Sequence, residues 1–158
     1  MLMSSEPEYT ASPTLGPFLS ALLCEKILEE KDGIKTAVRI LDQINRGMTG
    51  VGLTPPAIME PFEYPLGLLV RLKAGAARGM YPINVKILKP NNDSAGELNH
   101  PVHLPGPDDA GVDIVLNAMM RIDQVGTWWF DIYVGEERWT RVPLRVVYFP
   151  QSIKHPGM

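Results

Sequence analysis

The stretch Gly126–Phe149, GTWWFDIYVGEERWTRVPLRVVYF, constrains the fold of this chain more than any other part of the sequence. Apolar residues recur at every second position on both sides of a turn at Gly135-Glu136-Glu137. The two apolar faces are formed by Trp128, Phe130, Ile132 and Val134 and by Val142, Leu144, Val146 and Tyr148. This period predicts a β-hairpin with one buried side. Because a lone hairpin is not stable in water, the rest of the chain must supply a sheet that covers it.

Other segments show the same alternation. Strands are expected at residues 18–28, 34–44, 65–73, 81–89 and 111–123. Asp32-Gly33 is a strong turn signal that joins the first two as a hairpin, although residues 34–44 also match the apolar stripe of a helix. Residues 65–73 and 81–89 are expected to form a second hairpin. Pro82 is expected at a sheet edge or a bulge, because proline lacks a backbone N–H.

These runs amount to about seven strands with turn signals between them. Such a pattern favours an all-β fold, a two-sheet sandwich of immunoglobulin-like or C2-like type. With 158 residues, 45% of them hydrophobic, one domain is expected. We place it at residues 17–150, between a flexible N-terminal arm (1–16) and a C-terminal tail (151–158). Residues 45–64 and 90–111 are expected to be long loops, because glycine, proline and polar residues are frequent there.

Composition narrows the classes of function. The net charge of −3 argues against a general nucleic-acid binder. No apolar run reaches the roughly 18–20 residues that span a bilayer, and residues 1–17 lack the basic and apolar regions of a secretory signal. Cys24 is the only cysteine, so the chain forms no internal disulfide. A buried Cys24 and a cytoplasmic location are the expectations.

A candidate contact surface lies on the outward face of the C-terminal hairpin. If Trp128 points into the core, its neighbours Trp129, Asp131 and Tyr133 point outward, and the second strand presents Arg141 and Arg145 to them. Exposed Trp, Tyr and Arg are enriched at binding hot spots, so these five are the candidate partner-binding residues. The alternative is that the long segment 45–64 folds over this face and buries it.

A second candidate region is the polar segment 91–109, which contains His100, His103, Asp93 and Asp108-Asp109. Zinc needs converging ligands at about 2.0–2.2 Å, and calcium takes about six to eight oxygen ligands. The segment has no helix to aim both imidazoles at one point, and it offers too few carboxylates for calcium. For these reasons metal or ligand binding by this segment is kept only as the alternative function, and no metal or cofactor is assigned.

Basic residues recur on the expected middle hairpin, at Arg71, Lys73, Arg78, Lys86 and Lys89. A basic face can meet an anionic partner, but no aromatic residues interleave to stack bases, and lysines on a solvated sheet face also discourage edge pairing. The sequence shows no nucleophile–base pair and no glycine-rich phosphate loop. No catalytic residue is assigned, and an enzyme is not expected.

Two stretches together resemble a known group of proteins. The first is LLCEKI (Leu22–Ile27) with the following Asp-Gly turn and AVRILDQI, and the second is GTWWFDIYVGEERWTRVPLRVVY. They are similar to small, uncharacterised bacterial β-sandwich proteins that open on a Cys-Glu-Lys strand and close on a Gly-aromatic-aromatic-Phe-Asp hairpin. The resemblance implies an immunoglobulin-like fold and a bacterial or phage source, and it implies no activity.

The sequence as a whole favours a non-catalytic module that binds a protein partner, such as an accessory subunit of a bacterial or phage system. The missing catalytic motifs and the outward Trp, Tyr and Arg residues are the observations behind this expectation. The sequence does not fix the partner or the oligomeric state.

Overall fold

The computed structural model describes residues 11–48 and 58–150. Within these ranges the secondary structure consists of nine strands. Their bounds are β1 Phe18–Glu29, β2 Lys35–Ile40, β3 Gln43–Met48, β4 Ile58–Lys73, β5 Gly79–Leu88, β6 Ser94–Leu104, β7 Gly111–Gln124, β8 Gly126–Val134 and β9 Glu137–Pro150. The segment 34–44, expected as one strand or as a helix, contains no helix. It is also not one strand, because it holds β2 and the first two residues of β3, which belong to different sheets and are separated by Leu41 and Asp42.

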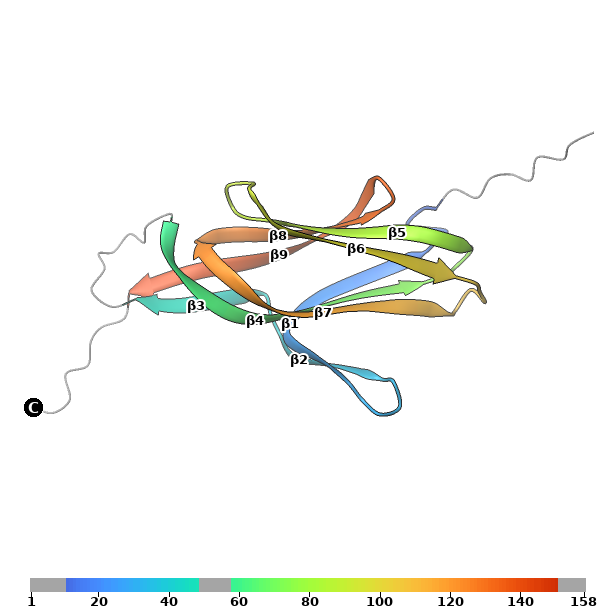
Figure 1. Ribbon diagram of the computed structural model, residues 1–158, viewed down its shortest axis with the longest axis horizontal. Helices are drawn as coiled ribbons and strands as arrows, with labels where there is room; N and C mark the ends of the chain where they lie inside the picture. The colour runs from blue at the N-terminus through green and yellow to red at the C-terminus, as the bar shows by residue number, and fades with distance from the viewer. Residues whose placement is uncertain (1–10, 49–57, 151–158) are drawn as a thin grey trace, which may run out of the picture.

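The strands form two sheets that face each other (Figure 1). One has four strands in the order β2-β1-β4-β7, and the other has five in the order β3-β9-β8-β5-β6. Neighbouring strands are antiparallel except β3, which runs parallel to β9. The prediction of an all-β fold with two sheets is confirmed, with nine described strands rather than about seven.

The two extra strands lie where the sequence predicted loops. β6 occupies half of the expected loop 90–111, and most of β3 lies at the start of the expected connection 45–64, whose residues 58–64 already belong to β4. β6 carries Gly96 and Pro101 and has exposed residues on both faces. An edge strand contacts only one neighbour, so its residues need not alternate cleanly, and the alternation signal is weak.

The predicted hairpin of residues 65–73 and 81–89 is wrong, because its two strands belong to different sheets. β4 pairs with β1 and β7, whereas β5 pairs with β6 and β8. The intervening segment passes from one sheet to the other and buries Ala74 and Ala77. Pro82 lies inside the sheet, opposite Pro101 of β6 and just beyond the residues of β5 that pair with β8, so the missing N–H is tolerated there.

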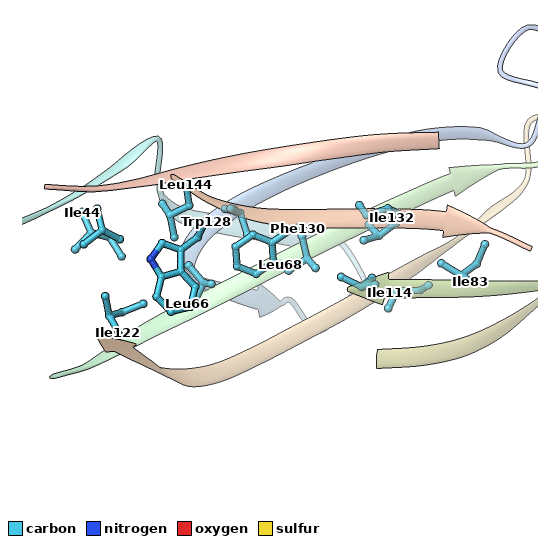
Figure 2. Close-up of a cluster of buried hydrophobic side chains, with 14 of the residues drawn as sticks. Ile44, Leu66, Leu68, Ile83, Ile114, Ile122, Trp128, Phe130, Ile132 and Leu144 are labelled. Atoms are coloured by element: carbon cyan, nitrogen blue, oxygen red, sulfur yellow. The ribbon is translucent and has the colours of Figure 1, made fainter. Parts of the chain in front are cut away.

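The core lies between the two sheets and is built around the C-terminal hairpin (Figure 2). Trp128, Phe130 and Ile132 are fully buried, as the alternation predicts. The opposite sheet covers them with Leu66, Leu68, Ile114 and Ile122. The Trp128 indole N–H donates to the carbonyl of Gln124 at 3.1 Å, so the largest core residue leaves no polar atom unpaired.

β1 and β2 form the hairpin that Asp32-Gly33 predicted, and Figure 1 shows it projecting from the four-stranded sheet. β1 pairs with β4 only as far as Cys24, which faces Gly67. Beyond that point the side chain of Asn117 on β7 replaces a neighbouring strand. Its Oδ1 accepts from the Ile27 N–H at 2.8 Å, and its Nδ2 donates to the Ile27 carbonyl at 2.9 Å.

Gly67 makes this arrangement possible. A Cβ at residue 67 would lie 3.0 Å from the Cys24 sulfur and 3.1 Å from both the Ile27 nitrogen and Asn117 Oδ1. Such contacts are tighter than side chains normally tolerate in a packed interior. Glycine in the middle of β4 therefore lets the Asn117 side chain reach across to β1.

The expected arm and tail fall largely outside the described residues, which exclude 1–10 and 151–158. At the inner end of the arm, Ser12 and Gly16 form an isolated bridge, and the Leu15 carbonyl accepts from the Ala76 N–H at 2.9 Å. These bonds attach that end of the arm to the domain. Over the part of the chain that the structure describes, no helix has the length and apolar character needed to cross a membrane.

Candidate functional site

The candidate site occupies the outer face of the five-stranded sheet, where β8 and β9 form the predicted hairpin. The strands are joined by Gly135-Glu136, and Gly135 adopts a φ of 61°, which glycine takes without strain. The alternation places Trp129, Asp131 and Tyr133 outward, opposite the buried Trp128 and Phe130. The predicted orientation of the three outward residues is therefore confirmed.

Asp131 is the centre of the site. Its side chain is only 3% exposed, although it lies on an outer face. Arg141, directly opposite on β9, donates from Nε to Oδ1 at 2.7 Å, and Arg138 Nη1 lies 3.5 Å from Oδ2. A carboxylate enclosed in this way is stabilised by two cations and loses its mobility.

A bulge in β9 brings both arginines to one face. Tyr133 is paired with Arg138 and Ile132 with Thr140, so Trp139 is the extra residue. In a regular strand, residues three apart point to opposite faces. The bulge reverses this relation for Arg138 and Arg141, so that both reach Asp131.

Cations also lie over the two outward aromatic rings. The guanidinium of Arg141 is 4.2 Å from the centroid of the Trp129 ring, and Lys86 Nζ on β5 is 4.8 Å from that of Tyr133. Both are cation–π distances. We call Lys86, Trp129, Asp131, Tyr133, Arg138 and Arg141 the Asp131 cluster.

The structure brings four of the five predicted residues together and leaves one apart. Trp129, Asp131, Tyr133 and Arg141 belong to the cluster, whereas Arg145 is exposed and lies opposite Thr127, further along the hairpin. Sequence reasoning missed Lys86 and Arg138. The outward alternation of β5 signalled Lys86, but that strand was assigned to the wrong neighbour, and nothing in the pattern signalled the bulge that turns Arg138.

The described ends of segment 45–64 do not cover this surface. β3 pairs edge-to-edge with β9, and β4 lies in the opposite sheet, where Phe62 and Tyr64 pack on the core. Residues 49–57 lie outside the described residues. Trp129 and Tyr133 are each half-buried by their neighbours within the sheet.

The five basic residues assigned to a middle hairpin do not share a face. Arg71 and Lys73 lie on β4 in one sheet, and Lys86 lies on β5 in the other. Arg71 pairs with Asp113, Arg78 with Asp108 and Lys89 with Asp123. The expectation of one basic face is wrong because it depended on the incorrect β4–β5 pairing.

The segment 91–109 is not a single loop. Asn91 and Asp93 lie in the turn before β6, and Asp108 and Asp109 lie after it, so the 11 residues of β6 separate them. At about 3.3 Å per residue, this strand is roughly 36 Å long. His100 and His103 are three apart on it and point to opposite faces. In the described ranges, 11–48 and 58–150, no group of three or more His, Cys, Asp or Glu could hold a metal ion.

Cys24 is fully buried, as expected. Burial raises the pKa of its thiol, and the backbone N–H groups of Lys26 and Val38 oppose this shift only in part. The thiol lies 3.6 Å from the Gly67 carbonyl, to which it donates. A thiol that is protonated and enclosed is packed as a small apolar group rather than poised as a nucleophile.

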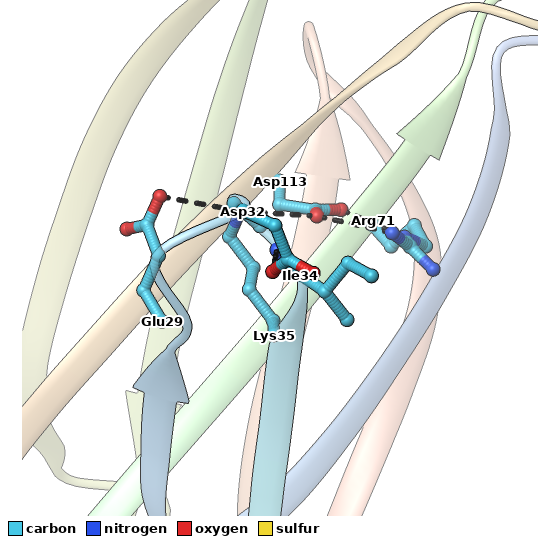
Figure 3. Close-up of polar contacts among 7 residues, drawn as sticks. Glu29, Asp32, Ile34, Lys35, Arg71 and Asp113 are labelled. Carbon is cyan, nitrogen blue, oxygen red and sulfur yellow. Dashed lines mark hydrogen bonds and ion pairs between the residues drawn. The ribbon is translucent and has the colours of Figure 1, made fainter.

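A second carboxylate lies between two cations on the outer face of the four-stranded sheet (Figure 3). Asp113 on β7 accepts from Arg71 Nε at 2.9 Å, and Lys35 Nζ on β2 lies 3.5 Å from its other oxygen. We call Lys35, Arg71 and Asp113 the Asp113 cluster. Burial alone would raise the pKa of Asp113, but the hydrogen bond and charge of Arg71, with Lys35, outweigh it and lower the pKa below its ordinary 3.8.

The fold and the surface define an all-β protein of two facing sheets that carries a preorganised aromatic and charged cluster on one outer face. The chain belongs to a family of unknown function, DUF6941, whose family model matches residues 19–147. The expectation of membership in an uncharacterised family is thereby confirmed. Comparison with curated proteins finds none that matches this chain.

Proposed function

We propose that this protein is a non-catalytic interaction module, an accessory subunit of a bacterial or phage system, that binds a protein partner through the Asp131 cluster. The supporting observation is that Trp129, Tyr133 and Arg141 are held in fixed orientations on neighbouring strands by contacts within the cluster. Tryptophan, tyrosine and arginine in a rigid setting lose little conformational entropy on binding.

The charges of this surface favour a partner that carries charged groups of both signs. Lys86, Arg138 and Arg141 surround one buried carboxylate, and Arg145 lies nearby on the same strand. The side chains of Arg138 and Arg141 remain 46% and 33% exposed. Exposed carboxylates border these cations, because Glu97 lies opposite Lys86 and the turn carries Glu136 and Glu137. A partner protein with charged groups of both signs complements such a surface and associates faster for it.

The same geometry argues against single-stranded nucleic acid as the partner. Binding of unpaired bases needs aromatic rings with a free face for stacking. Arg141 lies over one face of Trp129 and Lys86 over one face of Tyr133, so each half-buried ring has at most one face left for a base. A partner protein can instead contact the ring edges and the outer sides of the two cations.

We further propose that the sandwich is immunoglobulin-like and that the protein acts in the cytoplasm. The order β9-β8-β5-β6 matches the G-F-C-C′ order of an immunoglobulin sheet, and β1-β4-β7 matches A-B-E. The fully buried thiol of Cys24 suits a reducing compartment. The alternative of a metal- or ligand-binding module at residues 91–109 has less support than the contact surface, because β6 separates the candidate metal ligands.

Comparative affinity capture tests the proposed function. Wild-type protein, Trp129→Ala, Arg141→Ala and a Met80→Ala control are used with lysate of the source organism, and the bound proteins are quantified together. Met80 is 64% exposed and lies on the same sheet outside the cluster. We expect at least one protein to bind wild type and Met80→Ala and to be lost from both cluster variants.

Equal recovery of the same proteins by wild type and by both cluster variants would refute the proposed contact surface. Circular dichroism and thermal melting of each variant show whether the sheets are intact, so a lost partner is not confused with a lost fold.

A further inference from the structure

The free edge of β7 is unusual among the four edge strands of the two sheets. β7 is 14 residues long and contains no proline. β2 and β3 have six residues each, and β6 carries Pro101 and a register irregularity beside Ile87. Proteins normally protect long edges with prolines, bulges or short strands, because an open edge presents unpaired backbone groups to another chain. β7 has none of these three devices, and its protection consists of charged side chains, Asp113, Arg121 and Asp123.

The outward side chains of β7 form a self-complementary sequence. Five of them, Asp113, Val115, Asn117, Met119 and Arg121, are arranged symmetrically about Asn117, and the next one, Asp123, forms an ion pair with Lys89. Val115 is 38% and Met119 57% exposed. Asn117 lies at the midpoint, with one apolar residue on each side and opposite charges at the two ends. When two such strands are placed antiparallel with Asn117 at the centre, each acidic residue lies opposite a basic one and each apolar residue lies opposite an apolar one.

We propose that two copies of this chain pair through their β7 strands, antiparallel and centred on Asn117, to form one continuous sheet of eight strands. This inference is independent of the proposed function, which uses the other sheet. In this register Asp113 lies opposite Arg121 of the second copy, and Val115 lies opposite Met119 of the second copy. The arrangement has two-fold symmetry, so each contact occurs twice.

The neighbouring strand β4 extends this match. Within one chain, Arg71 of β4 lies directly opposite Asp113 of β7, and Glu63 of β4 lies directly opposite Arg121 of β7. In the eight-stranded sheet, four charged side chains would lie next to one another across the strands and alternate in sign. They are Arg71 and Asp113 of one copy, followed by Arg121 and Glu63 of the second copy. Arg121 makes no ion pair with the residues that the structure describes, so pairing would supply its partner.

Other registers lose this complementarity. A shift of the centre to residue 118 places Asp113 opposite Asp123 of the second copy, and a shift to residue 116 places Arg121 opposite Gly111. Parallel pairing in register sets Asp113 against Asp113 and Arg121 against Arg121. Like charges directly opposite destabilise a sheet, so the sequence of β7 specifies the register centred on Asn117.

The first test measures the mass of wild type, Met119→Glu and a Met80→Glu control by sedimentation over a range of protein concentrations. We expect wild type and Met80→Glu to reach twice the mass of one chain. In Met119→Glu, the new carboxylate lies diagonal to Asp113 of the second copy. Its dimer dissociation constant should rise at least about tenfold, because both symmetry-related contacts change.

The second test fixes the register by disulfide trapping. In Val115→Cys/Met119→Cys the two residues are about 13 Å apart within one chain, too far for an internal disulfide. They lie opposite each other across the proposed pair, so mild oxidation should yield a covalent dimer on a non-reducing gel. Val115→Cys/Arg121→Cys, which matches the register centred on residue 118, should cross-link much less. Native Cys24 is fully buried and does not compete.

A wild-type protein that stays monomeric at every concentration overturns the proposal. So does a dimer that Met119→Glu and Met80→Glu affect equally, or one in which the Val115→Cys/Arg121→Cys pair cross-links as readily as the Val115→Cys/Met119→Cys pair.

Discussion

The outer faces of the two sheets each hold one aspartate between two cationic side chains, but they assemble it differently. Asp131 takes Arg141 and Arg138 from the other strand of its own hairpin, and its side chain is 3% exposed. Asp113 takes Arg71 and Lys35 from two separate strands, and its side chain is 13% exposed. The first cluster is a local feature of one hairpin, whereas the second connects distant parts of the chain.

The difference in assembly suits the two clusters to different roles. The Asp131 cluster holds aromatic and cationic groups in place on an open surface, which suits recognition. The Asp113 cluster links the projecting β1–β2 hairpin to β4 and β7, which suits attachment of that hairpin. Substitutions in the two clusters should therefore differ in how much they lower the unfolding free energy and in how much of the chain they affect.

The largest effect is expected from Asp131→Ala. Two arginines would then face each other without a counter-charge beside a buried site, and unfolding free energy should fall by about 2 kcal/mol. Chemical denaturation measures this loss. Glu97→Ala is the control, because Glu97 is an exposed carboxylate that bonds to Asn84 on the same sheet. An Asp131→Ala variant no less stable than Glu97→Ala would contradict the described role of Asp131.

Asn117→Ala tests how the hairpin is attached to the four-stranded sheet. Loss of the two hydrogen bonds to Ile27 should cost about 1–2 kcal/mol. Amide exchange should accelerate mainly in residues 25–40, because the rest of the sheet keeps its own pairs. Asn117→Asp should not restore stability, since it removes the N–H donor. Uniform acceleration across both sheets would show that Asn117 does not act locally.

Asp113→Asn should cost less, about 1 kcal/mol near neutral pH, because Arg71 is half exposed and solvent screens the pair. Because the folded pKa of Asp113 lies below 3.8, its ionised form stabilises the fold above that pH. This contribution disappears as the pH falls from 3.8 through the folded value. The difference in unfolding free energy between wild type and Asp113→Asn should therefore be constant above pH 3.8 and shrink below it. A difference that grows as the pH falls would show that ionised Asp113 does not stabilise the fold.

Arg145→Ala should have the smallest effect, below about 0.5 kcal/mol, because Arg145 is exposed and lies outside the Asp131 cluster. A matched Arg141→Ala variant should be clearly less stable, since Arg141 bonds to Asp131 and lies over Trp129. Thermal melting of the two variants side by side measures the difference. Equal losses would place Arg145 in the cluster after all.

The two clusters also mark how far the sequence alone could predict this molecule. Asp131 and Arg141 lie ten residues apart in one hairpin, so alternation and a tight turn were enough to predict that they meet. Asp113 and Arg71 lie 42 residues apart, and their meeting depends on which strands pair across the whole chain. Local periodicity does not encode that choice, and so β4 was assigned to β5 instead of β7.

Local irregularities limited the prediction in a second way. The bulge at Trp139 turns Arg138 to the face of Asp131, and Gly67 opens the passage through which Asn117 reaches Ile27. Both depend on where single residues sit in a register that the sequence pattern leaves open. The buried face of the hairpin, from Trp128 to Val134, was predictable because its period is regular.

The most direct test of the account is the affinity of a partner captured by wild type, measured by calorimetric titration against wild type, Trp129→Ala and Arg71→Ala. Trp129 belongs to the Asp131 cluster, and Arg71 belongs to the Asp113 cluster on the opposite sheet. We predict that Trp129→Ala weakens binding about thirtyfold, as for a hot-spot residue, and that Arg71→Ala binds as wild type does. Unchanged affinity in Trp129→Ala, or an equal loss in Arg71→Ala, would contradict the claim that the Asp131 cluster is the contact surface.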